Sequence, residues 1–428
     1  MSPPNTPYLS VGIDVAADFS VICIMSPSFE TFCKPFKVIH TDLESMTKAV
    51  ATIKKAEERF AMKSQVFLES TGIFHLPLFC YLRNAGLEVS VLNPLVTHSN
   101  KNADIRKVKN DKFDSIKIAK LGLNPNIKRS IVPEEFVLNL RFLCREYYSL
   151  SDNRTALVNK LSNYIRLAFP AYIGIFSDST GDASLAILSC VQSLDHLLGA
   201  PKDELVNLIA KTARKGAVYA ENKYNAIINA TAVSKEITMA LPNAFGLIHY
   251  IIKLINAIDE QMDEVVTTIK GIVKTNAEHK FVKQIHIVDS INGVGFLSAV
   301  TLMCEVGDYD AFKSAKQLFG FFGLEPSVNE SGKFKGNRNH ISKRGSRFAR
   351  RVLYTVALAS VRNKTNGQPI NPILQAYYQE KIKSKLKKVA LGAVMHKVVN
   401  IVFAVLRDET NFVLRTTEEH VQRHKVAA

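Results

Sequence analysis

Short apolar runs and two helical patterns alternate along the first ninety residues. Residues 41–60 carry apolar side chains at helical spacing, and residues 75–85 form a second, shorter helical pattern. Five runs have the length and β-branched content of buried strands. They are residues 8–14, 20–25, 32–39, 65–68 and 87–92. The pattern therefore predicts three strands, a helix, a strand, a helix and a last strand.

This order of elements is typical of an RNase H-like α/β domain. In such a domain an antiparallel meander of three strands leads into a parallel part, and helices cover the sheet. The Asn93-Pro94 pair ends the fifth strand. The N-terminal fold class is therefore α/β.

The rest of the chain is predominantly helical. Residues 133–169 and 234–275 are two long amphipathic patterns, the second interrupted early by Pro242. They flank residues 170–235, which read as short helices, so we expect an antiparallel coiled coil that carries an insert; an ordinary helical domain is the alternative. Further helices are expected at residues 285–291, 296–305, 312–322, 347–361 and 389–407. The whole chain is thus α/β plus α.

Charge then narrows the class of protein. The 428 residues include 55 Lys and Arg against 39 Asp and Glu, a formal net charge of +16, with 47% hydrophobic residues. An excess of this size in a globular chain favours a nucleic-acid partner. The six cysteines are scattered singly, which fits a reduced cytoplasmic interior and speaks against a zinc module. No signal peptide is visible, and the longest apolar tract, residues 398–406, is shorter than the roughly 20 residues of a membrane span.

Four carboxylates stand where strands or helices begin and end. Asp14 ends the first strand, Glu69 ends the fourth, and Asp111 and Asp114 open a helical segment three residues apart. Strand ends converge at one edge of an α/β sheet. Clustered carboxylates repel one another unless cations neutralise them, and such oxygen-rich sets hold Mg²⁺. Taken singly, Asp111 could cap a helix and Asp14 could end a strand in a turn, but the combination favours a metal site.

A second constellation lies in the polar, basic segment of residues 323–345. Ser331 stands beside Gly332, free of crowding, and could attack a phosphate as a nucleophile; alone, Ser-Gly is a common turn, and Ser342 and Ser346 are competitors. The surrounding cations match a phosphate backbone. They are Lys333, Lys335, Arg338, Lys343, Arg344, Arg347, Arg350 and Arg351.

The third constellation is the sequence Asn292-Gly293-Val294-Gly295 between two short apolar helices. This pattern resembles a helix–hairpin–helix, in which backbone N–H groups at a helix N-terminus bind a phosphate without reading bases. A tight turn with no ligand is the alternative. Gly293 and Gly295 are therefore candidate nucleic-acid contacts.

Taken together, these residues resemble the DEDD transposases of insertion-sequence family one-ten, whose relatives include the Piv-type DNA invertases. At the N-terminal end the likeness rests on VGIDVAAD, FLESTGIF, VSVLNP and KNDKFDSIKIAKL, and at the C-terminal end on the run from SINGVGFLSAV to SRFARRVLY. It covers about residues 8–165 and 283–408, and residues 170–235 match poorly.

The resemblance implies a RuvC-like first domain and a role for each candidate residue. Asp14, Glu69, Asp111 and Asp114 stand at the positions of a catalytic, Mg²⁺-binding tetrad, and Ser331 at that of a nucleophilic serine. Family members cut and rejoin donor and target DNA as their element is excised and inserted, guided by an element-encoded bridge RNA. They work as multimers, so we expect a homo-dimer or tetramer, in the bacterial cytoplasm and associated with the nucleoid, with no membrane partner.

These observations predict four segments. They are a RuvC-like domain at residues 1–135, a helical and coiled-coil region with an insert at 136–282, a C-terminal transposase domain at 283–410, and a tail at 411–428. The leading function is a transposase or recombinase. A site-specific invertase would carry the same residues, a simple RuvC-like nuclease would leave the Ser331 segment unexplained, and a non-catalytic nucleic-acid-binding scaffold would not need the carboxylates.

Overall fold

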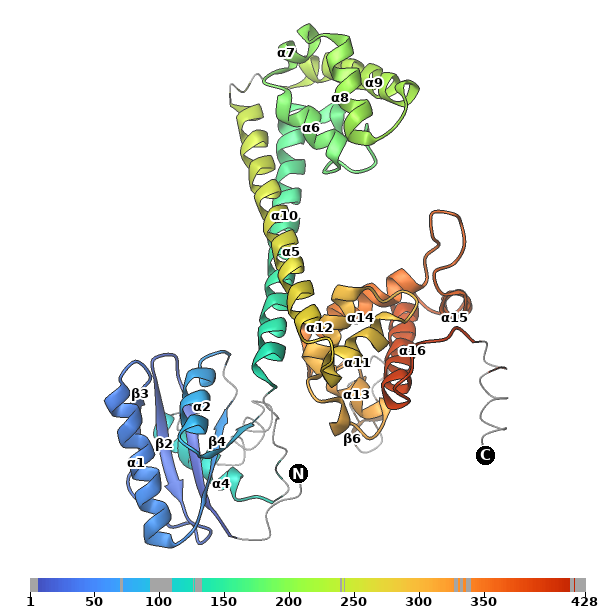
Figure 1. Cartoon of the computed structure of the whole chain (residues 1–428). Coiled ribbons are helices and arrows are strands. Elements are labelled where there is room, and N and C mark those ends of the chain that lie inside the picture. The colour runs from blue at the N-terminus through green and yellow to red at the C-terminus, as the bar shows by residue number, and fades with distance from the viewer. Residues whose placement is uncertain are drawn as a thin grey trace. The chain divides into compact units, whose positions relative to one another are not determined.

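The computed structural model divides the chain into two compact units, Met1–Glu134 and Glu135–Ala428 (Figure 1). It describes residues 7–69, 72–92, 110–125, 127, 133–238, 241, 243–326, 330–331, 334–335, 340–415 and 419. The sequence features at Asn93-Pro94, Lys109, Pro242, Gly332, Lys333 and Arg338 lie outside these residues.

The N-terminal unit is built on a mixed sheet with the order β3-β2-β1-β4-β5. Strand β1 pairs antiparallel with β2 and parallel with β4, and β5 extends the parallel side. The strands are Leu9–Val15, Phe19–Met25, Phe36–Ile39, Ser64–Glu69 and Glu88–Leu92 in chain order. The predicted RNase H-like α/β class is confirmed. Strand β3 is shorter than predicted, because Pro35 lacks the N–H that the ladder needs.

The two faces of this sheet are covered by different helices. On one face, the odd-numbered residues of β1 and the even-numbered residues of β4 lie in the larger core of this unit. Both helices α1 (Leu43–Phe60) and α2 (His75–Asn84) contribute side chains to that core. On the opposite face, Phe67 and Leu92 bury against Ile118 of α4 (Asp111–Gly122), and Cys23 and Met25 bury against Ala119. Side chains of a strand alternate between faces, so Ser10, Gly12 and Asp14 share the α4 face.

In the C-terminal unit, α5 (Glu135–Ala168) and α10 (Ala244–Thr275) run side by side in opposite directions, as predicted (Figure 1). Two contacts set their register. The Arg154 guanidinium donates to both Asp259 carboxylate oxygens at 2.5 and 3.0 Å, and the Phe169 ring lies 6.5 Å from that of Phe245.

The insert packs into a core of its own with the adjoining halves of α5 and α10. Its longest helix has 21 residues, so the insert is more regular than the predicted set of short helices. The elements are η1 (Pro170–Tyr172), α6 (Asp182–Cys190), α7 (Leu194–Gly199), α8 (Lys202–Ala213) and α9 (Ala217–Ile237).

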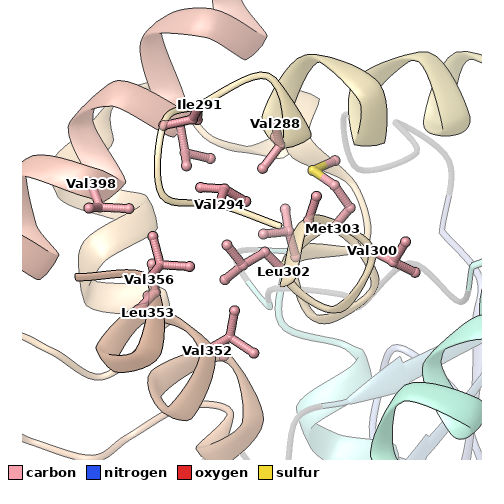
Figure 2. Close-up of a cluster of buried hydrophobic side chains, with 14 of the residues drawn as sticks. Val288, Ile291, Val294, Val300, Leu302, Met303, Val352, Leu353, Val356 and Val398 are labelled. Atoms are coloured by element: carbon pink, nitrogen blue, oxygen red, sulfur yellow. The ribbon is translucent and has the colours of Figure 1, made fainter. Parts of the chain in front are cut away.

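The C-terminal helices form a separate core with the other ends of α5 and α10. Figure 2 shows its centre, where Ile291 and Val294 from the turn between α11 and α12 lie beside Val356 and Val398. Its elements are α11 (Lys280–Asp289), α12 (Phe296–Val306), η2 (Tyr309–Ala311), α13 (Ala315–Phe321), β6 (Glu330–Ser331), β7 (Phe334–Lys335), α14 (Arg347–Ser360), α15 (Pro372–Ile382) and α16 (Lys387–Arg407). The predicted run 312–322 begins as a helix only at Ala315, because Ser314 caps it by accepting from the Gln317 N–H.

Helix α16 is more apolar than the sequence interpretation allowed. Among the described residues it is the one helix of sufficient length and hydropathy to cross a membrane, with 21 residues and a mean hydropathy of 2.0 in its most apolar window. Half of that window is buried within the protein. Leu391, Val394 and Val398 belong to the C-terminal core, where Figure 2 shows Val398. Burial in this core accounts for its composition.

Candidate active site

The ends of β1 and β4 bring two of the candidate carboxylates to one edge of the sheet. Ile13 pairs with Leu68 in the parallel ladder, so Asp14 and Glu69 are the next residues on two adjacent strands. Adjacent strands lie about 4.8 Å apart, and in-register residues of parallel strands point to the same face. Both side chains therefore project on the face that α4 covers.

Helix α4 approaches β1 closely enough to require glycine at two positions. A Cβ atom on Gly12 would lie 2.1 Å from the Ala119 nitrogen and 2.4 Å from the Ser115 oxygen. One on Gly122 would lie 2.3 Å from the Ser10 hydroxyl oxygen. The Ser10 hydroxyl also donates to the Ala119 carbonyl at 2.7 Å. These backbone approaches fix where the first turn of α4 lies along β1.

That first turn carries the other two carboxylates. Asn110 caps α4 by accepting from the Lys112 N–H at 3.0 Å, so Asp111 is not the cap. Asp114 is 7% exposed and lies one residue before Ser115, which contacts Gly12, whereas Asp111 is exposed. Residues three apart in a helix are separated by about 60° around its axis, so the two carboxylates lie on the same side of α4, although only Asp114 is buried.

The donor chemistry fits a hard divalent cation, because Asp14, Glu69 and Asp114 offer carboxylate oxygens from one layer of the unit. Within the described ranges, however, no three His, Cys, Asp or Glu side chains lie close enough together to hold a metal ion. What supports a metal ion here is the chemistry of these carboxylate oxygens and the face of the sheet that Asp14 and Glu69 share.

Ser331 lies in a short β-hairpin of the C-terminal unit. Its backbone pairs with Phe334 between β6 and β7; its side chain is outside the described part. The hairpin root is a second antiparallel stretch, in which Ile341 pairs with Pro326 and the Ser342 N–H donates to the Glu325 carbonyl at 2.8 Å. We call residues 323–345 the hairpin arm.

Both competing serines make structural hydrogen bonds. The Ser342 hydroxyl donates to Glu325 Oε1 at 2.7 Å and holds the root of the hairpin arm. Ser346 caps α14, where its hydroxyl oxygen accepts from the Phe348 and Ala349 N–H groups, each at 3.2 Å. These partners give Ser342 and Ser346 roles in folding.

The candidate cations fall into two groups. Lys343, Arg344 and Arg347 are exposed. Arg350 instead donates to the carbonyls of Phe322 and Gly345 at 3.1 and 2.8 Å and so ties α14 to the root of the hairpin arm. For Lys335 only the backbone is described.

Arg351 also has partners inside the protein. It donates to Asp152 at 2.7 Å and to the Ser151 hydroxyl at 3.2 Å, and its guanidinium lies 4.9 Å from the centre of the Tyr148 ring. Arg351 therefore holds α14 against α5. Arg350 and Arg351, which the sequence predicts as phosphate contacts, both donate hydrogen bonds to groups inside the protein.

The two glycines of the turn between α11 and α12 differ. Gly293 has φ +102°, and a Cβ atom there would lie 2.2 Å from the Ser360 hydroxyl oxygen, so packing against α14 explains it. Gly295 precedes α12, is exposed, and has open space at its Cβ position among the described atoms. Of the two, Gly295 presents a helix N-terminus to solvent.

An ion pair between Arg145 and the buried Glu305, beneath α14, escaped the sequence interpretation. Arg145 donates to both oxygens of Glu305 at 2.8 and 3.0 Å, and the Glu305 side chain is 4% exposed. Burial alone would raise the pKa of Glu305, but hydrogen bonding to Arg145 and its charge lower it below the usual value. The partners are 160 residues apart, so no local motif signals them.

Family models match both ends of the chain. One for DEDD transposases, described as Transposase, matches residues 11–170, and one described as Transposase IS116/IS110/IS902 family matches residues 285–379. These matches define a transposase. The chain belongs to the IS110 family of transposases.

Individual relatives are more distant. An insertion element IS116 protein of Streptomyces clavuligerus is 23% identical over 65% of this chain and 66% of its own length. The transposase of IS1111A from Coxiella burnetii is 31% identical over 36% of this chain and 39% of its own length. The pilin gene-inverting protein of Moraxella bovis is 28% identical over 31% of this chain and 39% of its own length. The chain thus spans less than two thirds of each of these relatives.

A solved structure, T. thermophilus RuvC in complex with Holliday junction substrate, aligns with 29% of this chain and 99% of that one. At 10% identity and a TM-score of 0.22 it carries no argument, and the α/β assignment rests on the sheet itself.

Proposed function

We propose that this protein is a DNA transposase that cuts and rejoins strands with a carboxylate site in its first unit and a serine nucleophile in its second. The observation that carries the proposal is the placement of Asp14 and Glu69 on one sheet edge, on the face where α4 begins with Asp111 and Asp114. Family membership supports DNA as the substrate.

The four carboxylates would hold Mg²⁺, which when bound neutralises charge on the reacting phosphate. In the proposed cleavage the Ser331 Oγ–P bond forms as the P–O3′ bond breaks, and the 3′ oxygen leaves as a hydroxyl. The serine proton passes to a base or to solvent. Attack by a free 3′ hydroxyl on the phosphoserine then reseals the strand and releases Ser331.

Covalent linkage suits an enzyme that must rejoin strands. Hydrolysis would discard the phosphodiester bond energy, and the chain has no Walker-type GxxxxGK[ST] loop to supply energy from ATP. A phosphoserine keeps that energy in the protein–DNA bond. The need to keep this bond energy favours a transposase over a simple RuvC-like nuclease.

The nucleic-acid partners follow from charge and family. We propose that Lys343, Arg344 and Arg347, which are exposed, contact phosphates together with the other cations of the hairpin arm. Guidance by an element-encoded RNA and assembly as a dimer or tetramer rest on the resemblance. A site-specific invertase is the second candidate, because the pilin gene-inverting protein is among the relatives.

Strand transfer by the Asp14→Asn variant tests this function. Asn keeps the size of the side chain but removes the charge, so recombination of an element-bearing plasmid should fall below detection while thermal melting stays near wild type. Asp18→Asn is the matched control, since Asp18 is exposed in the next turn. Full activity of Asp14→Asn would exclude the carboxylate site, and loss in both variants would point to unfolding rather than chemistry.

A further inference from the structure

Positive charge is concentrated in one part of the C-terminal unit. Residues 283–410 contain 20 Lys and Arg against 9 Asp and Glu, a net +11 out of +16 for the chain. Residues 182–237 of the insert contain 6 Lys and Arg and 6 Asp and Glu. Glu380 is the one acidic residue in the sequence from 331 to 407. The hairpin arm contains part of this excess positive charge, and the other lysines and arginines lie elsewhere in the C-terminal unit.

Much of the remainder gathers where α15 meets α16. Five lysines fall within the eight residues 381–388, and residues 383–389 are exposed. We call this segment the lysine corner. Its members are Lys381, Lys383, Lys385, Lys387 and Lys388.

The backbone of the lysine corner is held in place. The Lys385 N–H donates to the Lys381 carbonyl at 3.0 Å, and the Val389 and Ala390 N–H groups donate to the Leu386 carbonyl at 2.9 and 3.0 Å. From Ala390 onward α16 is anchored in the protein interior. The ammonium groups are therefore presented from a fixed support.

Most of these charges are uncompensated. Lys383 pairs with exposed Glu380 at 2.6 Å. Within the described residues no ion pair involves Lys385, Lys387 or Lys388. Adjacent unpaired lysines repel one another, and a polyanion would relieve that repulsion by displacing counterions.

The cationic surface continues along α16 through an aromatic side chain. Lys381 and Lys397 both lie against the Tyr377 ring, with Nζ 5.2 and 5.3 Å from its centre. Lys397 of α16 and Lys381 of α15 thus share one aromatic ring. The surface thus spans both helices rather than a single loop.

We propose that the lysine corner binds the phosphodiester backbone of a nucleic-acid duplex, as a second contact surface in addition to the hairpin arm. The inference rests on the proposed function for the presence of DNA, and its chemistry is independent of base sequence. Lys385, Lys387 and Lys388 form its centre. A membrane surface fits less well, because besides Leu386 and Val389 the apolar side chains of α16 are largely buried, whereas interfacial helices expose a full apolar face.

The test uses the full chain and its triple variant Lys385→Gln/Lys387→Gln/Lys388→Gln. Fluorescence anisotropy follows binding to a labelled random-sequence DNA duplex, and to an RNA duplex of equal length, from 50 to 200 mM salt. The matched control is Lys211→Gln/Arg214→Gln/Lys215→Gln, which removes the same charge from exposed positions of the neutral insert.

We expect the lysine-corner variant to bind DNA about tenfold more weakly at low salt, equally for unrelated sequences, with the salt slope reduced by about 2 to 3. The insert control should bind as wild type, and both variants should melt as wild type. A loss confined to the RNA duplex would also support a phosphodiester surface and would assign it to RNA. Unchanged binding to both duplexes, or an equal loss in the insert control, would overturn the inference. Failure here leaves the Asp14→Asn result standing, since strand transfer and this contact are measured separately.

Discussion

The sheet edge of the N-terminal unit and the hairpin arm of the C-terminal unit position their reactive groups differently. Asp14 and Glu69 are placed by the register of a buried sheet, and close backbone contacts at Gly12 hold α4 on top of them. Ser331 sits in a hairpin whose strands are two residues long, and Arg350 of α14 ties the hairpin root to the helical core. Acidic groups that share a cation need fixed neighbours, whereas a nucleophile must reach its phosphate.

The most damaging change to the sheet edge short of removing a carboxylate should be Gly12→Ala. The added Cβ atom would meet backbone atoms of Ala119 and Ser115 within 2.4 Å, so α4 must shift away from β1. We expect a loss of about 1–3 kcal/mol in unfolding free energy, as for overpacked cores, together with loss of strand transfer. Urea denaturation and the recombination assay measure the two effects.

Gly271→Ala in α10 is the control for that substitution, because its Cβ position is open among the described atoms. Alanine is the better helix former there, so stability should rise by up to about 1 kcal/mol with strand transfer intact. If Gly12→Ala proved as stable and as active as wild type, close packing would not be what holds the edge.

A smaller effect is expected where the fold supports the hairpin arm, at Glu305. Because hydrogen bonding to Arg145 lowers the folded-state pKa of Glu305, its stabilisation is complete above the unfolded pKa of about 4.3 and is lost as the pH falls through the folded value. Glu305→Gln should cost about 2 kcal/mol at pH 7, since Arg145 is 40% exposed and partly screened. It should also flatten the fall in stability below about pH 4.3.

Denaturant unfolding at pH 7 and between pH 3 and 5 tests that prediction. Glu380→Gln removes an exposed partner of Lys383 and should leave both profiles unchanged. An unaltered acid profile in Glu305→Gln would mean that the Arg145 pair does not couple protonation to folding.

The sequence predicted the sheet better than it predicted the cations. Alternation and β-branched runs give the strands of the first unit, and once β1 and β4 are parallel neighbours the ends at Asp14 and Glu69 must meet. The burial of Asp114 next to an exposed Asp111 depends on the phase of α4 relative to the sheet, which no local pattern contains. The partners that Arg350 and Arg351 have inside the protein, at Phe322 and Asp152, lie elsewhere in the sequence, so no local pattern shows them, and the phosphate contacts of both arginines stay predictions. The lysine corner is visible in the sequence as a charge run that lies outside the motifs.

The identity of the residue that becomes linked to DNA tests the account most directly. Reaction complexes trapped during strand transfer would be trimmed with nuclease and analysed by mass spectrometry. The account predicts a nucleotide on Ser331 through a 5′ phosphate, with a free 3′ hydroxyl on the other strand end, and no adduct in Ser331→Ala although that variant still binds DNA. An adduct on Ser342 or Ser346, or cleaved DNA with no adduct, would contradict it.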